Sequence, residues 1–287
     1  MSPAFDALRN WFRHPSLRIG AIASLLLLLV GFVSIVWTPY PIEAISIGDA
    51  MQDFSAAHWL GTDHLGRDML SLVMKGTLTS FVVAAIAVAI GTLVGVPLGL
   101  AAAAWGGPAE WAILRINDFL FAFPALIIAM LITTIFGPGA INAMIAVGIF
   151  NIPVFARVAR GGALSLRTLD YIAAARLAGM GPLAIARRHI LPNIASLIIV
   201  QATIQLALGI LAEAGLSYVG LGTQPPATSL GLMLRDAQTY ALLKPSLALI
   251  PGITIILIVV ALNLAGDGLG DQLDPRLRRI GGARGSA

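Results

Sequence analysis

The sequence has 287 residues, of which 58% are hydrophobic and only 11% are charged. Soluble domains usually carry about a quarter of their residues as charge, so this composition excludes an ordinary soluble protein and indicates a chain embedded in a lipid bilayer. The formal net charge of +4 is small, and no cysteine is present, which excludes disulfides and thiolate metal sites.

The first long uncharged stretch covers residues 19–42, between Arg18 and Glu43. A helix of about 20 apolar residues crosses the hydrocarbon core, so this stretch predicts the first membrane span. A cleaved signal peptide is the alternative, because arginines precede the stretch, but FVSIVWTPYP offers no small-residue cleavage site. The residues that follow, up to 75, are expected to form an external amphipathic segment. This segment either faces a substrate-binding protein or seals the first span against the others.

Five more spans are predicted from the remaining uncharged stretches, at residues 77–104, 119–136, 140–156, 190–212 and 245–266. The sequence FGPGA separates the third span from the fourth, because glycine and proline are the strongest local breaks. Residues 214–234 are also uncharged, but their two prolines and several glycines would leave amides unpaired in lipid, so we expect a partly buried external loop. The expected fold class is an all-α polytopic membrane protein with six transmembrane helices and both termini cytoplasmic.

Three parts of the chain follow from these spans. Residues 1–75 hold a cytoplasmic N-terminal segment, the first span and the external segment. Residues 76–267 form the main transmembrane domain, and residues 268–287 form a cytoplasmic tail.

The basic residues are distributed unevenly about these spans, whereas the acidic residues divide evenly. Lysine and arginine collect in cytoplasmic loops, and the six-span arrangement places 14 of the 18 basic residues inside. The inside residues are Arg9, Arg13, Arg18, Arg115, Arg157, Arg160, Arg167, Arg176, Arg187, Arg188, Arg276, Arg278, Arg279 and Arg284.

The cytoplasmic connection 157–193 is expected to fold as helix, turn and helix. Thr168 is expected to cap the first helix, Gly179 to end it in a left-handed conformation, and Pro182 to begin the second helix. Small side chains on one face of the first helix would let another protein approach closely. That face carries Tyr171, Ala174, Ala175 and Ala178. The alternative is an ordinary basic loop that only obeys the positive-inside rule.

Several motifs in this chain resemble one family. AAARLAGMGPLAIARRHILPN resembles the cytoplasmic EAA loop of ABC importer permeases, although Ala173 stands where the family has its glutamate. HWLGTDHLGRDMLS, RINDFLFAFP, ARVARGGALSLRTLDY, GLSYVGLGTQPP and NLAGDGLGDQLDPRLR are similar, in this order, to segments of the C-type permease subunits of dipeptide, oligopeptide and nickel importers. The chain is therefore identified as a member of that permease family.

The resemblance implies a type I importer fold and one half of a translocation path for peptides or related small solutes. It implies that the EAA loop, mainly the helix from Leu169 to Ala178, couples the spans to a groove of an ATPase. The expected coupling residues are Asp170, Tyr171, Ala173, Ala174, Ala175, Arg176 and Gly179. The expected partners are a second permease subunit in a heterodimer, two ATPase subunits, an extracytoplasmic substrate-binding protein and lipid, without nucleic acid. The expected location is the bacterial cytoplasmic (inner) membrane.

The chain is not expected to be an enzyme, and no catalytic residue, metal site or cofactor is expected in it. A phosphate-binding loop requires Gly-Lys-Ser/Thr, but the only lysines, Lys75 and Lys244, follow Met and Leu. ATP and magnesium are therefore expected on the partner ATPase subunits.

Other candidate residues are few. Glu213, near the outer end of the fifth span, is a candidate for the translocation path, because an ionisable group at membrane depth is often functional. Arg115 and Asp118 are expected to form a structural ion pair. His58 and His64 are six apart, which does not suit a helical metal pair.

Two other function classes stay open at this stage. A secondary transporter would be expected to carry buried ionisable groups in mid-span and an internal repeat, and neither is evident in this sequence. A membrane scaffold would move no solute. ATP dependence of uptake distinguishes the first alternative, and loss of uptake on deletion of the chain distinguishes the second.

Overall fold

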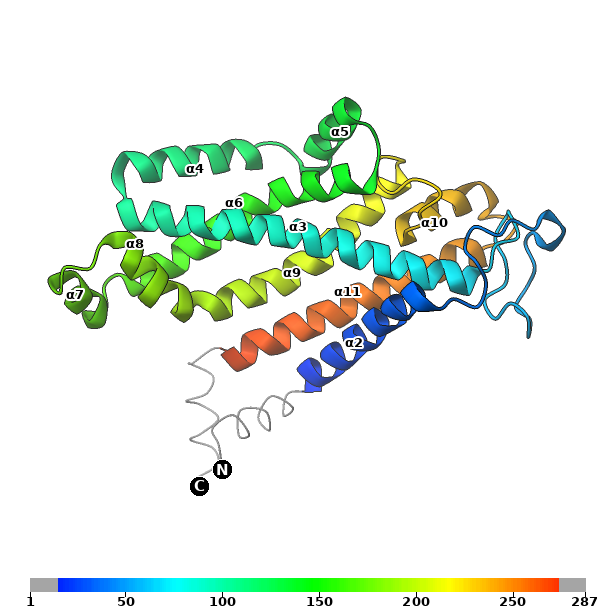
Figure 1. Ribbon diagram of the computed structural model, residues 1–287, viewed down its shortest axis with the longest axis horizontal. Coiled ribbons are helices and arrows are strands. Elements are labelled where there is room, and N and C mark those ends of the chain that lie inside the picture. The colour runs from blue at the N-terminus through cyan, green and yellow to red at the C-terminus, as the bar shows by residue number, and fades with distance from the viewer. Residues whose placement is uncertain (1–14, 274–287) are drawn as a thin grey trace, which may run out of the picture.

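The computed structural model describes residues 15–273, which form a bundle of long helices with shorter helices at both ends (Figure 1). The longer helices are α2 (Pro15–Val36), α3 (Met69–Trp105), α4 (Gly107–Phe121), α5 (Ala125–Phe136), α6 (Ala140–Leu166), α9 (Leu191–Tyr218) and α11 (Ser246–Leu273). The shorter elements are η1 (Ile47–Asp49), α7 (Asp170–Leu177), α8 (Pro182–Ile185), the π-helical η2 (Ala186–Ile190), α10 (Leu230–Ala237) and η3 (Gln238–Tyr240).

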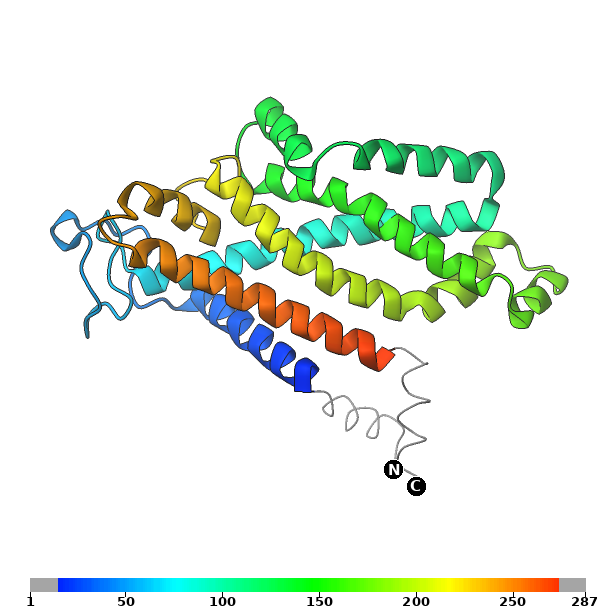
Figure 2. The same ribbon diagram turned by 180° about the vertical axis from the view of Figure 1, so that it is seen from behind.

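Within residues 15–273, five helices are long and apolar enough to cross a membrane: α2, α3, α6, the continuous helix Pro182–Tyr218 and α11. The chain between α3 and α6 makes the remaining crossing through α4 and α5, which return along the bundle (Figures 1 and 2). The prediction of six membrane crossings is therefore confirmed. A single third span at 119–136 is wrong, because the helix breaks at residues 122–124 and Pro124 becomes the N-cap of α5. Proline disfavours the helical conformation of the residue before it, here Phe123.

Two helices extend well beyond the predicted spans. α3 begins at Met69 rather than at 77, because the Asp68 carboxylate accepts a hydrogen bond from the Ser71 amide at 2.8 Å and so caps the helix. α6 continues past 156 to Leu166, into what was expected to be the cytoplasmic connection. The second half of that connection is also helical, since α8 and η2 run directly into α9.

The extension of α6 is accommodated by ion pairs with α4. Arg157 Nη2 lies 2.7 Å from Asp118 Oδ1, and Arg160 Nε lies 2.7 Å from Glu110 Oε1. The expected pair between Arg115 and Asp118 is therefore wrong, and the Arg115 guanidinium instead lies over the ring of Trp111 on the same helix. Because the charges of Arg157 and Arg160 are paired, both residues fit within α6, which continues to Leu166.

The longest helix contact, between α3 and α6, is built on glycine. Gly91, Gly95 and Gly99 lie on one face of α3, one turn apart. Side-chain atoms at Gly95 and Gly99 would overlap the backbone of α6 at Ile152 and Ala156 respectively. Small residues at this spacing let two helices in a membrane approach closely, so α3 and α6 form the rigid centre of the bundle.

The external segment folds back onto the start of α3. The Tyr40 amide donates to Ser71 Oγ at 3.1 Å, and His58 Nδ1 lies 2.9 Å from Asp68 Oδ1. The Lys244 ammonium, just before α11, contacts backbone carbonyls of this segment. These contacts favour the interpretation of the segment as a seal on the bundle.

Residues 214–234 do not form a span, as expected. Their first residues complete α9 and their last residues begin α10, with an external loop between the two helices. Leu230 and Leu232 of α10 are buried against α9 and α11. The expected partly buried loop thus includes one helical turn at each end.

The topology makes a direct prediction for labelling. Ser165 is exposed near the end of α6, just before α7, and Ala227 is exposed in the loop between α9 and α10. The helices α7 and α10 lie toward opposite ends of the bundle (Figure 1). Because the chain has no cysteine, Ser165→Cys and Ala227→Cys are each expected to give one reactive thiol. A membrane-impermeant maleimide added to intact cells is expected to label position 227 and to spare position 165 until the cells are opened. Labelling of 165 in intact cells would contradict the six-span topology.

Candidate functional site

The short helix α7 and the turn after it project from one end of the bundle, beyond the ends of α3, α6 and α9 (Figures 1 and 2). The expected cap at Thr168 is wrong: Leu169 is the N-cap, with an extended backbone and no side-chain hydrogen bond. The helix begins one residue too late for the Thr168 hydroxyl to serve its first amides. Asp170 in the first turn instead places a negative charge at the positive end of the helix dipole.

The turn after α7 has the geometry expected from its glycine. Gly179 has a φ of +82°, and its amide donates to the Arg176 carbonyl at 3.0 Å. The next amide, of Met180, donates back to the Ala175 carbonyl at 3.1 Å. This pair of hydrogen bonds is a Schellman motif, which fixes the direction in which the chain leaves the helix. Pro182 then begins α8 at the first helical turn, as expected.

The two faces of α7 differ in a way that the sequence did not show. Ile172 and Ala175 point inward and are 0% and 9% exposed. The other expected coupling residues are exposed, namely Asp170, Tyr171, Ala173, Ala174, Arg176 and Gly179. The expected outward face of four residues is therefore wrong at Ala175, whose methyl group packs against the bundle. The other three residues of that expected face, Tyr171, Ala174 and the C-cap Ala178, are exposed.

The inward face of α7 belongs to a continuous apolar cluster, which we call the junction cluster. Its buried members are Val96, Leu100, Ala103, Phe155, Ala159, Ala163, Ile172, Ala175, Ile185, Ala186, Ile190, Ile194 and Ile198. They come from α3, α6, α7, α8, η2 and α9. In addition, Arg167 Nη1 donates to the Ala103 carbonyl at 2.6 Å, which ties the end of α6 to the end of α3. Because close-packed interiors transmit displacement, a force on α7 would reach three membrane helices at once.

Two exposed leucines lie on either side of the turn. Leu177 at the end of α7 is 91% exposed and Leu183 in α8 is 60% exposed, among basic residues at the cytoplasmic end. Apolar side chains gathered at a projecting tip favour contact with another protein. The sequence reasoning missed both residues. The signal that could have found them is an apolar residue on each side of a glycine turn inside an otherwise basic connection.

Glu213, the candidate for the translocation path, is 0% exposed. Its carboxylate accepts hydrogen bonds from Ser80 Oγ at 2.8 Å, Ser217 Oγ at 2.6 Å and Thr223 Oγ1 at 3.3 Å. These donors come from α3, from α9 and from the loop before α10. Glu213 therefore links three segments of the chain through buried hydrogen bonds. A role of Glu213 toward cargo stays a prediction.

The external end carries ionisable groups with a structural arrangement. Burial raises the pKa of Asp236 in α10, and the guanidinium of Arg67, 3.6 Å away, partly opposes this shift. His64 stacks on Tyr240 with ring centroids 5.1 Å apart, while His58 pairs with Asp68. Within residues 15–273, no group of three or more His, Asp or Glu side chains is placed to hold a metal ion.

The chain is similar in sequence to known transport proteins. Residues 95–279 match the model of a family described as binding-protein-dependent transport system inner membrane component. The chain is 42% identical over 271 residues to the glutathione transport system permease protein GsiD of Pectobacterium atrosepticum, covering 94% of this chain and 90% of the relative. It is 39% identical over 269 residues to the protein of the same name in Escherichia coli O6:K15:H31, covering 93% and 89% respectively.

Solved structures show a similar fold. The chain resembles one from an inward-facing conformation of the MetNI methionine ABC transporter, with a TM-score of 0.58 and 21% identity, covering 72% of this chain and 98% of that chain. A second crystal form of the same transporter gives a TM-score of 0.59 at the same identity and coverage. At this identity the similarity concerns the fold alone.

Proposed function

Because the chain belongs to the family of binding-protein-dependent transport system inner membrane components, it is a permease subunit of an ABC importer, and we propose that its cargo is a short peptide such as glutathione. The family places it in the bacterial inner membrane, with ATPase activity on separate subunits and a substrate-binding protein as a partner. The cargo is supported by relatives at 42% and 39% identity that are named for glutathione transport. Glutathione is itself a tripeptide, which agrees with the resemblance to peptide permeases.

The permease works, in this proposal, as half of a heterodimer with a second permease subunit and two ATPase subunits. Support comes from the resemblance to the C-type member of peptide permease pairs and from the apolar, exposed side of α4 and α5. Trp111, Ile116 and Phe119 on α4 are each more than half exposed in the isolated chain. We assign this side to the second permease, so that the translocation path lies between the two subunits.

The coupling site is, in this proposal, the exposed face of α7 together with the turn at Gly179. The observation that carries it is the double role of α7, which offers an exposed tip to a partner and buries Ile172 and Ala175 in the junction cluster. An ATPase bound to the exposed face would move α7, and the junction cluster would pass that movement to α3, α6 and α9. Nucleotide can shift the inward-facing and outward-facing populations only if the complex binds it with different affinity in the two states.

ATP and magnesium bind, in this proposal, to the partner subunits. Lys75 near the start of α3 and Lys244 before α11 are the only lysines, and neither follows a glycine-rich turn. Both lie toward the external end, and the Lys244 ammonium is already occupied by the carbonyls of Met51 and Gln52. The chain therefore has no lysine where cytoplasmic ATP would meet it.

Reconstitution tests this function. The purified chain is expected to show no ATP hydrolysis and no nucleotide binding at micromolar concentrations, because it lacks a phosphate-binding loop. With its ATPases, second permease and binding protein in proteoliposomes, we expect ATP-dependent uptake of labelled glutathione or a short peptide. Uptake driven by an ion gradient without ATP would contradict an importer of this class. ATP-driven uptake of a different solute, with no uptake of peptides, would contradict only the cargo.

A further inference from the structure

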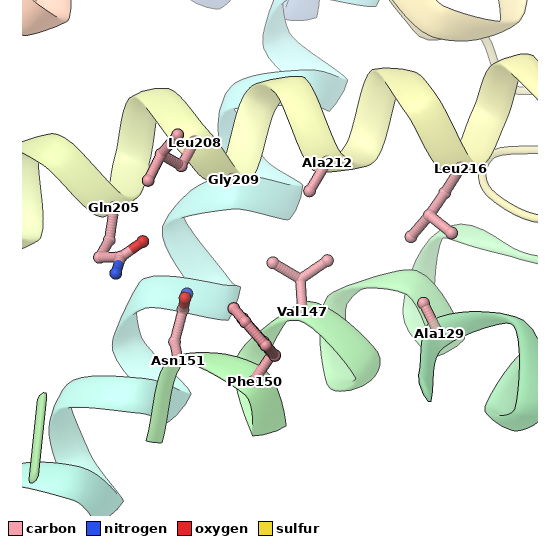
Figure 3. A pocket seen from close by; sticks show the side chains of 9 residues that line it. All are labelled: Ala129, Val147, Phe150, Asn151, Gln205, Leu208, Gly209, Ala212 and Leu216. Atoms are coloured by element: carbon pink, nitrogen blue, oxygen red, sulfur yellow. The ribbon is translucent and has the colours of Figure 1, made fainter. Parts of the chain in front are cut away.

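A small cavity lies between α5, α6 and α9 (Figure 3). Its volume is about 60 Å³, and apolar side chains such as Val147, Phe150, Leu208 and Leu216 form most of its wall. The two exceptions are the amides of Asn151 and Gln205, which point into the space between α6 and α9 from opposite sides (Figure 3). The cavity is therefore an apolar chamber with one polar end.

The Asn151 amide is not explained by the packing of the chain. The side chain is 3% exposed, and its Nδ2 atom has no hydrogen-bond partner among the described residues. Gln205 is 7% exposed. An unpaired buried amide destabilises a protein, and polar groups in the apolar middle of a membrane are costly. Because Asn151 also lines the cavity, its amide is available to a molecule that enters the cavity.

A close contact with α3 also restricts the position of Asn151. Its Cβ packs against Gly91 of α3, where any side chain would overlap it. The Asn151 amide points away from its helix toward Gln205 and lines the cavity (Figure 3). Asn151 lies in the middle of α6 and Gln205 in the middle of α9, so the polar end of the cavity lies near the centre of the membrane.

The chemistry of the two side chains selects the kind of group that would fit. Each primary amide offers N–H donors and a carbonyl acceptor and carries no charge. This combination is complementary to a peptide bond, which has one donor and one acceptor. A cavity of about 60 Å³ holds a few water molecules or one amide group, but not a whole tripeptide. An uncharged site also binds weakly enough to release a solute that must pass on.

We propose that Asn151 and Gln205 form a transient subsite for a peptide-bond amide of the cargo as it passes the centre of the membrane. This inference rests on the proposed peptide cargo. In the resting protein, water would occupy the polar end of the cavity, and the amide of the passing peptide would replace it. The apolar wall excludes further water, which strengthens the hydrogen bonds that the cargo makes there.

The test uses Asn151→Leu, which keeps the branched shape and removes the hydrogen bonds, and Gln205→Met, which keeps the length. Asn117→Leu is the matched control, because Asn117 on α4 is also buried with an unpaired Nδ2 but does not line this cavity. Uptake is measured in the complete complex with glutathione and with an analogue in which one peptide bond is an ester. The ratio of the two rates in each variant is compared with the ratio in the parent, so that discrimination by the shared binding protein cancels.

We expect both variants to accumulate at least as well as the parent, because Asn151→Leu removes an unpaired buried amide and Gln205→Met keeps the length of the side chain. Uptake of glutathione is expected to fall about three- to tenfold, the effect of one or two lost hydrogen bonds, and the preference for the peptide over the ester is expected to disappear. Asn117→Leu is expected to change neither. Unchanged uptake and preference in Asn151→Leu would overturn the subsite while leaving the peptide cargo in place. A parent complex that imports no peptide would overturn the cargo itself.

Discussion

Gly179→Val is expected to accumulate in the membrane like the parent and to lose most ATP-driven uptake. Gly179 has a φ of +82°, a conformation that a β-branched residue adopts only at a cost of about 1 to 3 kcal/mol. No atom of the described residues 15–273 lies within 4 Å of the position where a Cβ would be, so the effect comes from the backbone conformation. The turn would move, and the face of α7 that carries Tyr171 and Ala174 would point away from the ATPase. The measurements are membrane content, uptake and co-purification of the ATPase.

Gly181→Val is the control for this substitution. Gly181 has a φ of −68° and also has open space around it, so valine fits there without strain. It lies in the same turn, two residues away, and should leave uptake and ATPase association near the parent values. If Gly179→Val kept full uptake and normal ATPase association, residues 169–179 would be only a basic cytoplasmic connection. The coupling role would then have to be assigned to another part of the chain.

The sequence predicted those features of the coupling site that depend on local chemistry. The left-handed glycine and the proline at the start of α8 follow from backbone preferences, and the structure has both. The facing of α7 could not be predicted in the same way. Three consecutive alanines, 173–175, point to different sides of this helix, and the apolar contacts of Ile172 select which side is buried. Ala175 faces inward because it is buried in the same cluster as Ile172.

The difference between local chemistry and tertiary contacts also explains which features of the membrane spans could be predicted. Hydropathy and charge predicted six crossings, because lipid requires long apolar helices. Their ends depend on particular partners: Asp68 caps α3 early, and Asp118 and Glu110 on α4 pair with arginines that lengthen α6. The bend at Pro124 was readable in principle, because a proline inside a predicted span limits the residue before it. The unpaired amide of Asn151 had no signal in the sequence, since it depends on which side chains surround it.

The glycine face of α3 was readable and was missed. Gly91, Gly95 and Gly99 recur every fourth residue in an apolar helix, a spacing typical of close helix contacts in membranes. The structure shows what the spacing serves, because α6 lies directly against these glycines over two turns. The contact joins α3 to α6, and both helices contribute residues to the junction cluster, while Asn151 lies in the middle of α6. Loss of the contact between α3 and α6 would therefore disturb the packing of the bundle itself before it disturbs the coupling to an ATPase.

Gly95→Leu is expected to prevent normal accumulation of the protein. A side chain at Gly95 would overlap the Ile152 carbonyl oxygen and the Phe155 Cβ, and a backbone oxygen in a packed helix cannot turn aside as a flexible side chain can. Overpacking of a core usually costs about 1 to 3 kcal/mol, and more where the backbone must move. We therefore expect membrane content to fall on the order of tenfold, with a lower midpoint of thermal aggregation in detergent.

Gly161→Leu provides the comparison for this substitution, because Gly161 is also a helical glycine, in α6, with open space around it. Leucine favours a helix more than glycine does, so this variant should accumulate as well as the parent. Gly95→Ala separates the size of the side chain from its presence, and should give an intermediate loss because one methyl group already meets the carbonyl. Normal accumulation and normal thermal stability of Gly95→Leu would mean that α3 and α6 are not held at this distance, and the rigid centre assigned to them would have to lie elsewhere.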